Sequence, residues 1–426
     1  MGEENFRVRS WYNIVPELGF DIPRPLHPRE DRPATVEEFD WLWSREALKI
    51  EFLQGQYARD PWIEIPQRVL EGYAQYRPTP LYRARGLEKF LGTAAEIYLK
   101  REDQNPAGSH KLNTALAQAA YAAADPGVTT LVTDTGAGQW GSALSMAADR
   151  FGLKTKVFMT RKSYDDKPYR RYMMRMSGAE VYPSPSSVTE LGRKLLAEDP
   201  GQPGSLGIGM SEAIELVRSS PDHRLALGCM SYYAVLHQTV IGLETQSQLR
   251  ALDREPSHLV GCVGGGSNFV GFIAPFVVGR MRGQEVSFIA CEPENIATLS
   301  RGEYRYDWAD FGRHTPRITM FTLGHAFQPP KIHSGGLRYH GKTPVLSALV
   351  NRGLVRARTV TQRKVFEAGQ ILLKTEGVLP APESGHAVCA AIDMARDLAA
   401  GAVLVVCLSG HGYLDLKGYA EELGLE

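Results

Sequence analysis

The sequence predicts an α/β protein with two doubly wound domains, each with a parallel or mixed sheet covered by helices. Three observations support this prediction. Strand-like and helix-like segments alternate from Arg77 to the C-terminus, and glycine-rich turns directly follow several apolar strands. The 426 residues are also enough for two to three domains of about 150 residues each. Because parallel strands need long crossovers, usually helical ones, the alternation indicates parallel pairing.

Three segments are expected along the chain. Residues 1–76 are rich in proline, tryptophan and acidic side chains, and we expect them to form an N-terminal extension that wraps the body. Residues 77–228 are expected to form an N-terminal α/β domain, and residues 229–426 a C-terminal one. The sequence contains no internal repeat or low-complexity tract.

Residue patterns predict the strands and helices of the body in order. Apolar and β-branched runs predict strands within residues 96–103, 129–135, 155–161, 179–185, 257–268, 286–293 and 402–412. Apolar residues three and four positions apart predict helices within residues 110–124, 142–152, 167–178, 365–377 and 384–400.

Composition and charge exclude several classes of function. Lys and Arg together number 48, as do Asp and Glu, so no whole-chain field favours nucleic acid or an anionic membrane. The N-terminus lacks the apolar core of a signal peptide and the longest apolar run is too short to span a bilayer, so we expect a cytoplasmic protein. The cysteines are odd in number and far apart, which predicts free thiols and neither a disulfide framework nor a metal site. They are Cys229, Cys262, Cys291, Cys389 and Cys407.

The first glycine-rich turn carries a G-x-G-x-x-G pattern at Gly136, Gly138 and Gly141. This pattern is typical of dinucleotide binding when an acidic residue ends the following strand and contacts the ribose. Here that strand ends in Arg161 and Lys162 instead. The missing carboxylate argues against NAD, although Arg161 leaves open a contact with the 2′-phosphate of NADP.

The second glycine-rich turn is better suited to a phosphate group. Gly264, Gly265 and Gly266 follow an apolar strand directly, and Ser267 adds a hydroxyl donor. Because glycine has no Cβ, an anion can approach the backbone N–H groups and the N-terminus of the next helix closely. The alternative is a tight turn that needs glycine for its geometry alone.

Lys111 lies where a predicted helix begins, directly after a turn of small residues. A lysine is poorly placed there, because the positive end of the helix dipole favours acids. An amine in a desolvated, positive environment has a lowered pKa and is suited to Schiff-base formation. A reactive lysine combined with a phosphate-binding loop predicts pyridoxal 5′-phosphate as the cofactor.

Five motifs together resemble the tryptophan synthase β-subunit family. They read GSHKLN (108–113), TGAGQWG (135–141), VGGGSN (263–268), PAPESGHA (380–387) and LSGHG (408–412). The resemblance extends from about Trp11 to the C-terminus, and the long N-terminal region is similar to the second branch of the family. It implies a fold-type II pyridoxal-phosphate enzyme with its site between two domains. It also implies a homodimer without a stable α-subunit, and leaves a monovalent-cation requirement open.

The resemblance further implies a role for each motif. Lys111 would form the Schiff base with the cofactor and move the substrate Cα proton. The cofactor would otherwise be bound by His110, Gly264, Gly265, Gly266, Ser267 and Asn268 at its phosphate, by Ser409 at the pyridine nitrogen and by Glu376 near the ring. The substrate carboxylate would be bound by Thr135, Gly136, Ala137, Gly138 and Gln139. Arg338 would face the site and pair with an anionic group such as the phosphate of phosphoserine.

Two positions depart from the family pattern. Asp134 stands where the family has a glutamate that contacts the indole N–H, so the catalytic carboxylate is shorter by one methylene, about 1.5 Å. Tyr232 stands where the second branch usually has an asparagine. Both changes raise the question of whether indole is the acceptor.

The resulting functional prediction is a β-replacement on L-serine or O-phospho-L-serine that joins the amino acid to indole. Two alternatives use the same cofactor: replacement with a non-indole nucleophile, and deamination of serine or threonine. A non-catalytic binding or scaffold subunit is a third alternative, which the intact Lys111, Ser409 and glycine loop disfavour. The expected partners are a small amino acid and a nucleophilic acceptor, and neither nucleic acid nor a membrane.

Overall fold

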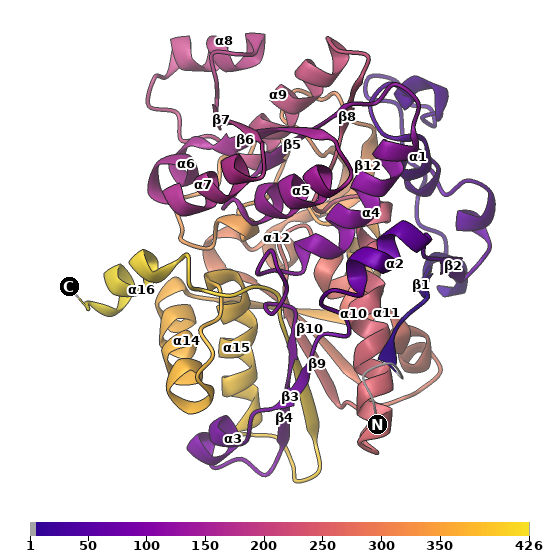
Figure 1. The fold of residues 1–426 in the computed structure, drawn as a ribbon. Coiled ribbons are helices and arrows are strands. Elements are labelled where there is room, and N and C mark those ends of the chain that lie inside the picture. Colours follow the sequence, from indigo (N-terminus) through magenta and orange to yellow (C-terminus); the bar gives the residue numbers. More distant parts are fainter. Residues whose placement is uncertain (1–5, 426) are drawn as a thin grey trace.

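The computed structural model describes residues 6–425 and contains a six-stranded and a four-stranded sheet, each packed against helices (Figure 1). The predicted α/β class with parallel and mixed sheets is confirmed. Residues 1–5 of the expected N-terminal extension lie outside the described residues.

The larger sheet has the strand order β13-β10-β9-β14-β4-β3. All neighbouring strands in it are parallel except β3 and β4, which pair antiparallel. Its strands are β3 (Leu81–Arg83), β4 (Glu96–Arg101), β9 (His258–Cys262), β10 (Ser287–Pro293), β13 (Val355–Val360) and β14 (Val403–Leu408). β14 consists entirely of buried apolar residues, as expected for a strand covered on both faces.

Helices cover the two faces of the larger sheet. Helices α14 and α15 lie on one side of it in Figure 1, and α10 and α11 on the other. The bounds of these helices are α10 (Tyr232–Ala251), α11 (Ser267–Met281), α14 (Gln362–Glu376) and α15 (Pro382–Ala395). Their apolar residues and those of the strands form the two main clusters of the core.

The smaller sheet has the order β7-β6-β5-β8 and is entirely parallel. Its strands are β5 (Thr130–Thr135), β6 (Lys154–Thr160), β7 (Glu180–Ser184) and β8 (His223–Leu225). The helices associated with it are α4 (Lys111–Ala124), α5 (Gln139–Arg150), α6 (Arg161–Asp166), α7 (Pro168–Met176), α8 (Glu190–Glu198) and α9 (Leu206–Arg218). Because the sheet is parallel, the carboxyl ends of its strands meet at one edge, where loops can form a site.

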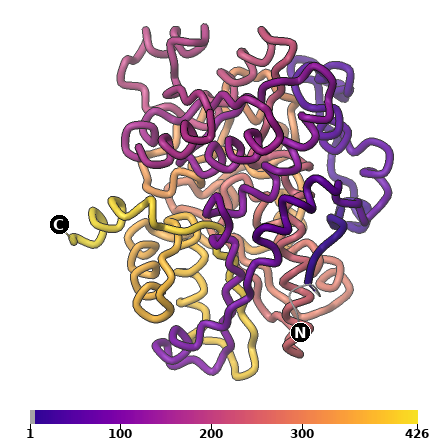
Figure 2. Tube along the Cα trace, in the orientation of Figure 1, coloured from indigo at the N-terminus to yellow at the C-terminus, as the bar shows by residue number. Residues whose placement is uncertain are grey.

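The N-terminal segment runs along the body, as Figure 2 shows in indigo. Its elements are β1 (Ser10–Tyr12), α1 (Arg45–Glu51), β2 (Trp62–Glu64), α2 (Gln67–Tyr73) and short 3-10 turns. Trp11 is fully buried, Tyr12 N donates to Thr239 Oγ1 on α10 at 3.0 Å, and Leu225 N donates to Leu42 O at 2.7 Å. The segment therefore contributes to the core of the body.

The sheets do not follow the expected division at residue 228. Strands β3 and β4 lie within residues 77–228 but join the sheet of the C-terminal segment, because β4 pairs with β14. A buried strand needs hydrogen-bonded neighbours on both edges, and β14 obtains them from β4 and β9. The boundaries at residues 76 and 228 stay a prediction about independent domains.

The remaining elements are α3 (Arg85–Leu91), a group between residues 294 and 351, and the C-terminal helix. A hairpin of β11 (Glu303–Trp308) and β12 (Arg317–Thr322) is followed by the 3-10 turn η6 (Gly335–Leu337). The other helices are α12 (Thr298–Arg301), α13 (Pro344–Asn351) and α16 (Leu416–Leu423). The sequence patterns identified neither this hairpin nor the short strands β3 and β8.

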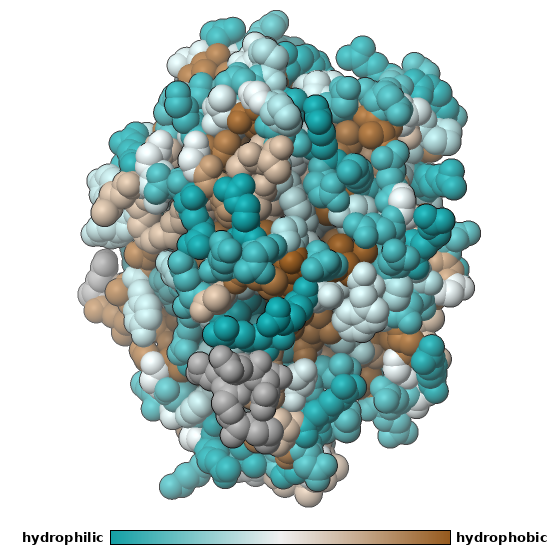
Figure 3. Space-filling model, turned by 45° about the vertical axis from the view of Figure 1, so that its right-hand side comes forward, coloured by the Kyte–Doolittle hydropathy of each residue, from teal (hydrophilic) through white to brown (hydrophobic). Residues whose placement is uncertain are grey.

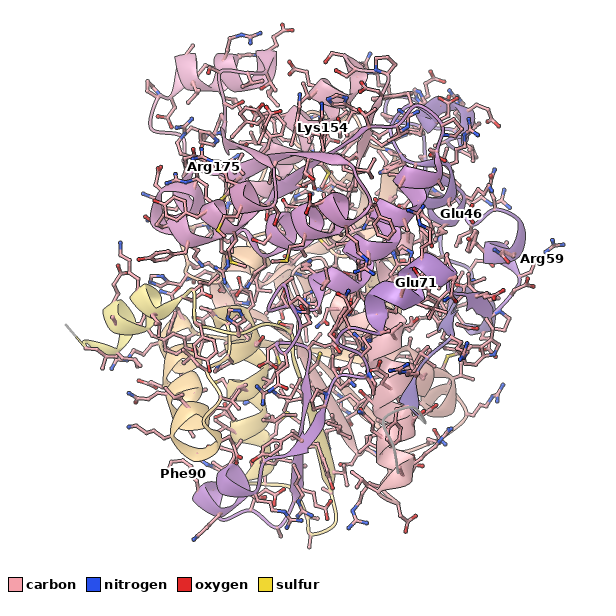
Figure 4. The ribbon with its side chains drawn as sticks, in the orientation of Figure 1. Glu46, Arg59, Glu71, Phe90, Lys154 and Arg175 are labelled. Atoms are coloured by element: carbon pink, nitrogen blue, oxygen red, sulfur yellow. The ribbon has the colours of Figure 1, made fainter. Side chains whose placement is uncertain are left out.

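One face of the molecule shows how polar and apolar side chains are distributed over the surface (Figure 3). The face drawn in Figure 3 is mostly hydrophilic, with apolar side chains in scattered patches. Arg59, Lys154 and Arg175, which Figure 4 labels, are exposed. Over residues 6–425, no helix is long and apolar enough to cross a membrane, and no cluster of His, Cys, Asp or Glu is suited to a metal ion. The five cysteines are free thiols.

A buried network of charges connects the segment after α2 with β4 and α10. The Arg77 guanidinium donates to Glu244 at 2.8 and 2.9 Å and to Glu102 at 3.1 Å. Lys100 Nζ donates to Glu244 Oε2 at 2.8 Å, so two cations balance two carboxylates. Burial alone would raise the pKa of Glu102, but Arg77 and Lys100 lower it to about 2. Arg77 Nη1 also donates to Asn113 Oδ1 at 2.8 Å, which connects the network to the first turn of α4.

We expect Arg77→Met to lower the free energy of unfolding by about 3–5 kcal/mol, because it leaves the buried Glu102 carboxylate without its guanidinium partner. Urea unfolding followed by circular dichroism measures this change. Arg363→Met is the matched control, since its pair with Glu367 is exposed and should contribute at most about 0.5 kcal/mol. Equal effects of the two substitutions would contradict the importance of the buried network.

Candidate active site

Lys111 begins α4, and its side chain reaches a cavity between the two sheets. Lys111 Nζ donates to the carbonyl oxygen of Gly228 at 2.6 Å. The cavity is lined by Lys111, Asp134, Thr135, Gly136, Ala137, Gln139, Trp140, Leu206, Met210, Leu227, Gly228, Cys229, Gly336 and Tyr339. One amine therefore faces an enclosure with mostly apolar and backbone walls, as a reactive lysine requires.

The loop after β5 forms one wall of this cavity. Four of its five predicted substrate residues, Thr135, Gly136, Ala137 and Gln139, line the cavity. The fifth, Gly138, has a φ of +96°, and a Cβ there would lie 2.8 Å from the Cβ of Arg170. The turn therefore needs glycine for both conformation and space. It presents backbone N–H groups at the N-terminus of α5, where an anion is favoured.

The predicted phosphate loop lies between β9 and α11. Gly266 has a φ of +103° and directly precedes α11, while Ser267 and Asn268 form the first, buried residues of the helix. A Cβ on Gly264 would lie 2.5 Å from the carbonyl oxygen of Gly336. The loop therefore packs so closely that side chains are excluded, which leaves its N–H groups as the available donors.

Residues of η6 lie between these two loops. A Cβ on Gly136 would lie 2.6 Å from Gly335 O, and Gly264 approaches Gly336 O as described. The Glu383 carboxylate connects η6 with the loop after β5, because it accepts the N–H of Gly336 at 2.8 Å and an Nε2–H of Gln139 at 3.2 Å. Glu383 is 5% exposed and lies in the first turn of α15, next to the positive end of the helix dipole.

Ser409 and His110 lie close together on adjacent segments. Ser409 Oγ is 2.8 Å from Ser384 Oγ and 3.4 Å from Cys262 Sγ, and it is buried. The ring Nδ1 of His110 is 3.1 Å from the Ser409 carbonyl oxygen, and the backbone N–H of His110 donates to the same oxygen. Burial and the charge of Lys111 lower the pKa of His110 to about 3, so its imidazole is neutral.

Glu376 does not lie near this cavity, and its predicted role near the cofactor ring needs correction. Its carboxylate accepts the N–H of Leu87 at 2.5 Å, at the start of α3, and the hydroxyl of Tyr82 at 2.7 Å. The glutamate that does meet the cavity loops is Glu383. The motif at residues 380–387 contained it, and a carboxylate at a helix start after a proline was the signal that could have identified it.

Arg338 and Tyr232 also lie outside the cavity lining. Arg338 is buried, donates to Pro329 O at 3.2 Å, and its Nε has no partner among residues 6–425. Its role toward an anionic substrate group stays a prediction. Tyr232 begins α10, and its N–H donates to Glu51 at 2.8 Å. The Tyr232 substitution therefore faces the N-terminal segment and has no direct contact with the cavity.

Asp134 is the one carboxylate among the residues that line the cavity. Burial raises its pKa from 3.8 to about 7, although its own backbone N–H and the charge of Lys111 act in the opposite direction. A Cβ on Gly209 would lie 3.1 Å from the Cβ of Asp134, so α9 packs directly against this side chain. A carboxylate with a pKa near neutrality is suited to accept a proton.

Comparison with known proteins identifies relatives over nearly the whole chain. The model of the family described as pyridoxal-phosphate dependent enzyme matches residues 73–410. A tryptophan synthase beta chain 2 of Thermococcus kodakarensis is 50% identical, with 97% of this chain and 93% of the relative covered. One of Thermotoga maritima is 48% identical, with 96% and 97% covered. One of Aeropyrum pernix is 51% identical, with 97% and 92% covered.

Solved structures are similar in fold at low sequence identity. A threonine deaminase of T.th. has a TM-score of 0.59 and 21% identity, covering 81% of this chain and 97% of its own. A fungal L-serine ammonia-lyase of Rhizomucor miehei has a TM-score of 0.60 and 17% identity, with the same coverage. These likenesses support the fold alone.

The raised pKa of Asp134 predicts a pH dependence of stability. Between pH 4 and pH 7 the folded protein binds a proton at Asp134 that the unfolded chain has lost, so the contribution of Asp134 to stability falls as pH rises. Relative to Asp134→Asn, the cofactor-free wild-type protein should lose about 4 kcal/mol of unfolding free energy across this interval. Denaturant unfolding at several pH values measures it, and parallel curves for the two proteins would contradict the raised pKa.

Proposed function

The chain belongs to the pyridoxal-phosphate-dependent enzymes and is a tryptophan-synthase-β-like member, and we propose that it joins L-serine or O-phospho-L-serine to indole. The observation that carries the proposal is the position of Lys111 Nζ in a cavity that the loop of residues 135–139 also lines. Relatives named tryptophan synthase beta chain 2, which are 50% and 48% identical to this chain, support this choice of reaction.

The residues present fit pyridoxal 5′-phosphate. A Cβ at Gly264 would collide with Gly336 O, so only glycine fits there, and no side chain on residues 264–266 covers the N–H groups that could bind a phosphate. Lys111 donates to a backbone carbonyl and can exchange this partner for the cofactor. Ser409 is a neutral hydroxyl, and unlike a carboxylate it does not keep the pyridine nitrogen protonated. We therefore assign the phosphate to residues 264–268 and the pyridine nitrogen to Ser409.

Once bound, the cofactor supplies an electron sink for the bonds at the substrate Cα. Lys111 Nζ accepts the Cα proton and later returns it. The N–H groups of the 135–139 loop bind the substrate carboxylate at the start of α5. Trp140, Leu206 and Met210 exclude water from the cavity, which protects the reacting carbon from hydrolysis.

Asp134 is assigned as the proton acceptor for the nucleophile. Its side chain is shorter than a glutamate, and Gly209 on α9 lies directly against it. Because the Asp134 carboxylate lies closer to β5 than a glutamate carboxylate would, it favours one alternative to indole: a nucleophile that extends further toward β5.

Deamination has no comparable support, because the deaminase structures are similar in fold alone. The proposed enzyme is a cytoplasmic homodimer without a stable α-subunit.

Lys111→Ala should reduce tryptophan formation to background, because both the covalent attachment and the proton transfer at Cα depend on Nζ. The measurement is tryptophan production from indole with serine and, separately, with phosphoserine. Lys89→Ala, on the exposed face of α3, is the control and should retain full activity. Wild-type rates in Lys111→Ala would overturn the proposed function.

The rate with indole should increase between pH 6 and pH 8, because Asp134 must lose its proton, with a pKa of about 7, before it can accept one. Asp134→Asn should lower the plateau rate by about 100-fold and remove this dependence. Rate measurements over this range with indole and with thiol acceptors provide the comparison. A thiol that outperforms indole would favour the non-indole alternative, and pyruvate release unaffected by any acceptor would favour deamination.

A further inference from the structure

Lys342 is a fully buried lysine that lies outside the cavity lining and that the assigned chemistry does not use. It lies between η6 and α13, with 0% of its surface exposed. Its Nζ donates to the carbonyl oxygen of Val263 at 3.4 Å and lies 3.8 Å from Glu292 Oε2. Burying an ammonium is strongly unfavourable unless its charge is compensated, so this side chain requires an explanation.

The nearby carboxylate compensates Lys342 only in part. Glu292 already accepts the N–H groups of Leu299 and Ser300 at 2.9 and 3.0 Å and the Ser300 hydroxyl at 2.8 Å. Its separation from Lys342 Nζ exceeds hydrogen-bond distance. Within residues 6–425 the ammonium thus has one carbonyl acceptor for its three N–H donors. Burial lowers the pKa of Lys342, and Glu292 acts against that change.

The position of Lys342 relates it to the phosphate loop. Val263, its hydrogen-bond partner, directly precedes Gly264. The next residue, Thr343, donates its N–H to Gly265 O at 2.7 Å, and a Cβ on Gly266 would lie 2.4 Å from Leu346 Cδ2. The segment from Lys342 to Leu346 therefore packs directly beneath the glycine loop.

The loop itself contains no charged side chain. Residues 264–268 offer N–H groups, a hydroxyl and an amide, whereas a phosphate ester at neutral pH carries nearly two negative charges. Among the cavity-lining residues the one cationic side chain is Lys111, which the proposed chemistry uses. An undercompensated buried cation therefore lies beneath an uncharged site for a dianion.

We propose that Lys342 supplies the counter-charge for the cofactor phosphate and offsets the negative charge of Glu292 beneath the glycine loop. The inference rests on the proposed function, since it assumes that residues 264–268 bind that phosphate. Lys342 acts on the phosphate through the backbone of the loop and through the electric field of its ammonium group, so it is a positioning residue. The positive charge polarises the Val263 carbonyl and favours an anion at the N–H groups that follow.

The test compares two cofactors, one with and one without the phosphate group that the loop is proposed to bind. Pyridoxal has the ring and aldehyde of pyridoxal 5′-phosphate but a hydroxymethyl group in place of the phosphate ester. Dissociation constants of both are measured by absorbance titration of cofactor-free protein. In Lys342→Met we expect pyridoxal 5′-phosphate to bind about tenfold more weakly and pyridoxal to bind within about twofold of wild type.

A second variant covers the case in which Lys342→Met does not fold, because it leaves Glu292 buried and alone. The double variant Lys342→Met/Glu292→Gln removes both charges. It should recover part of the lost affinity for pyridoxal 5′-phosphate but still bind it about threefold more weakly than wild type. Lys374→Met, at an exposed position on α14, removes one positive charge elsewhere and should leave both dissociation constants unchanged.

Two results would overturn the role of Lys342. If both cofactors bound more weakly by the same factor, Lys342 would support the packing of the loop rather than supply a counter-charge to the phosphate. Unchanged affinity for pyridoxal 5′-phosphate in the single or the double variant would mean that the loop needs no counter-charge. Failure of the wild-type protein to bind pyridoxal 5′-phosphate would instead contradict the proposed function, before any variant is considered.

Discussion

The position of Lys111 depends on the buried charges around Arg77. The Arg77 guanidinium and the Glu102 carboxylate both contact the Asn113 side chain, which lies two residues beyond Lys111 on α4. Gln238 on α10 contacts Asn113 and donates to the carbonyl oxygen of His110 at 3.1 Å. The first turn of α4 is thus held from several directions by buried hydrogen bonds. Such fixed supports keep a reactive side chain in one geometry.

The rest of the cavity depends on close approach of backbone segments. The 135–139 loop belongs to the smaller sheet and the 264–268 loop to the larger one, and the η6 backbone lies against both. Glu383 adds a directional contact, because one carboxylate binds an N–H of η6 and the amide of Gln139. Side chains on the glycines would separate these segments. The glycines therefore allow the two sheets to join at the cavity.

Features with a local signal could be predicted from the sequence. The α/β class, the main strands and helices, Lys111 and the two loops all follow from periodicity, glycine placement and helix-start chemistry. Glu376 and Glu383 illustrate the limit, since both lie near the same motif and only tertiary packing brings Glu383 to the cavity. Lys342 had no local signal, unlike Glu383, because nothing in the neighbouring sequence indicates that a lysine after a glycine is fully buried. The pairing of β4 with β14 is similarly non-local.

That pairing has a consequence for how the enzyme is made. β4 ends at Arg101 and β14 begins at Val403, so the larger sheet cannot close until nearly the whole chain has left the ribosome. The smaller sheet uses residues 130–225 only and can form during synthesis. Lys111 follows β4 and Ser409 follows β14, and the two segments pair at Ser109 and Gly410. Truncated or stalled chains thus contain Lys111 without Ser409, and the contact between their two segments forms last.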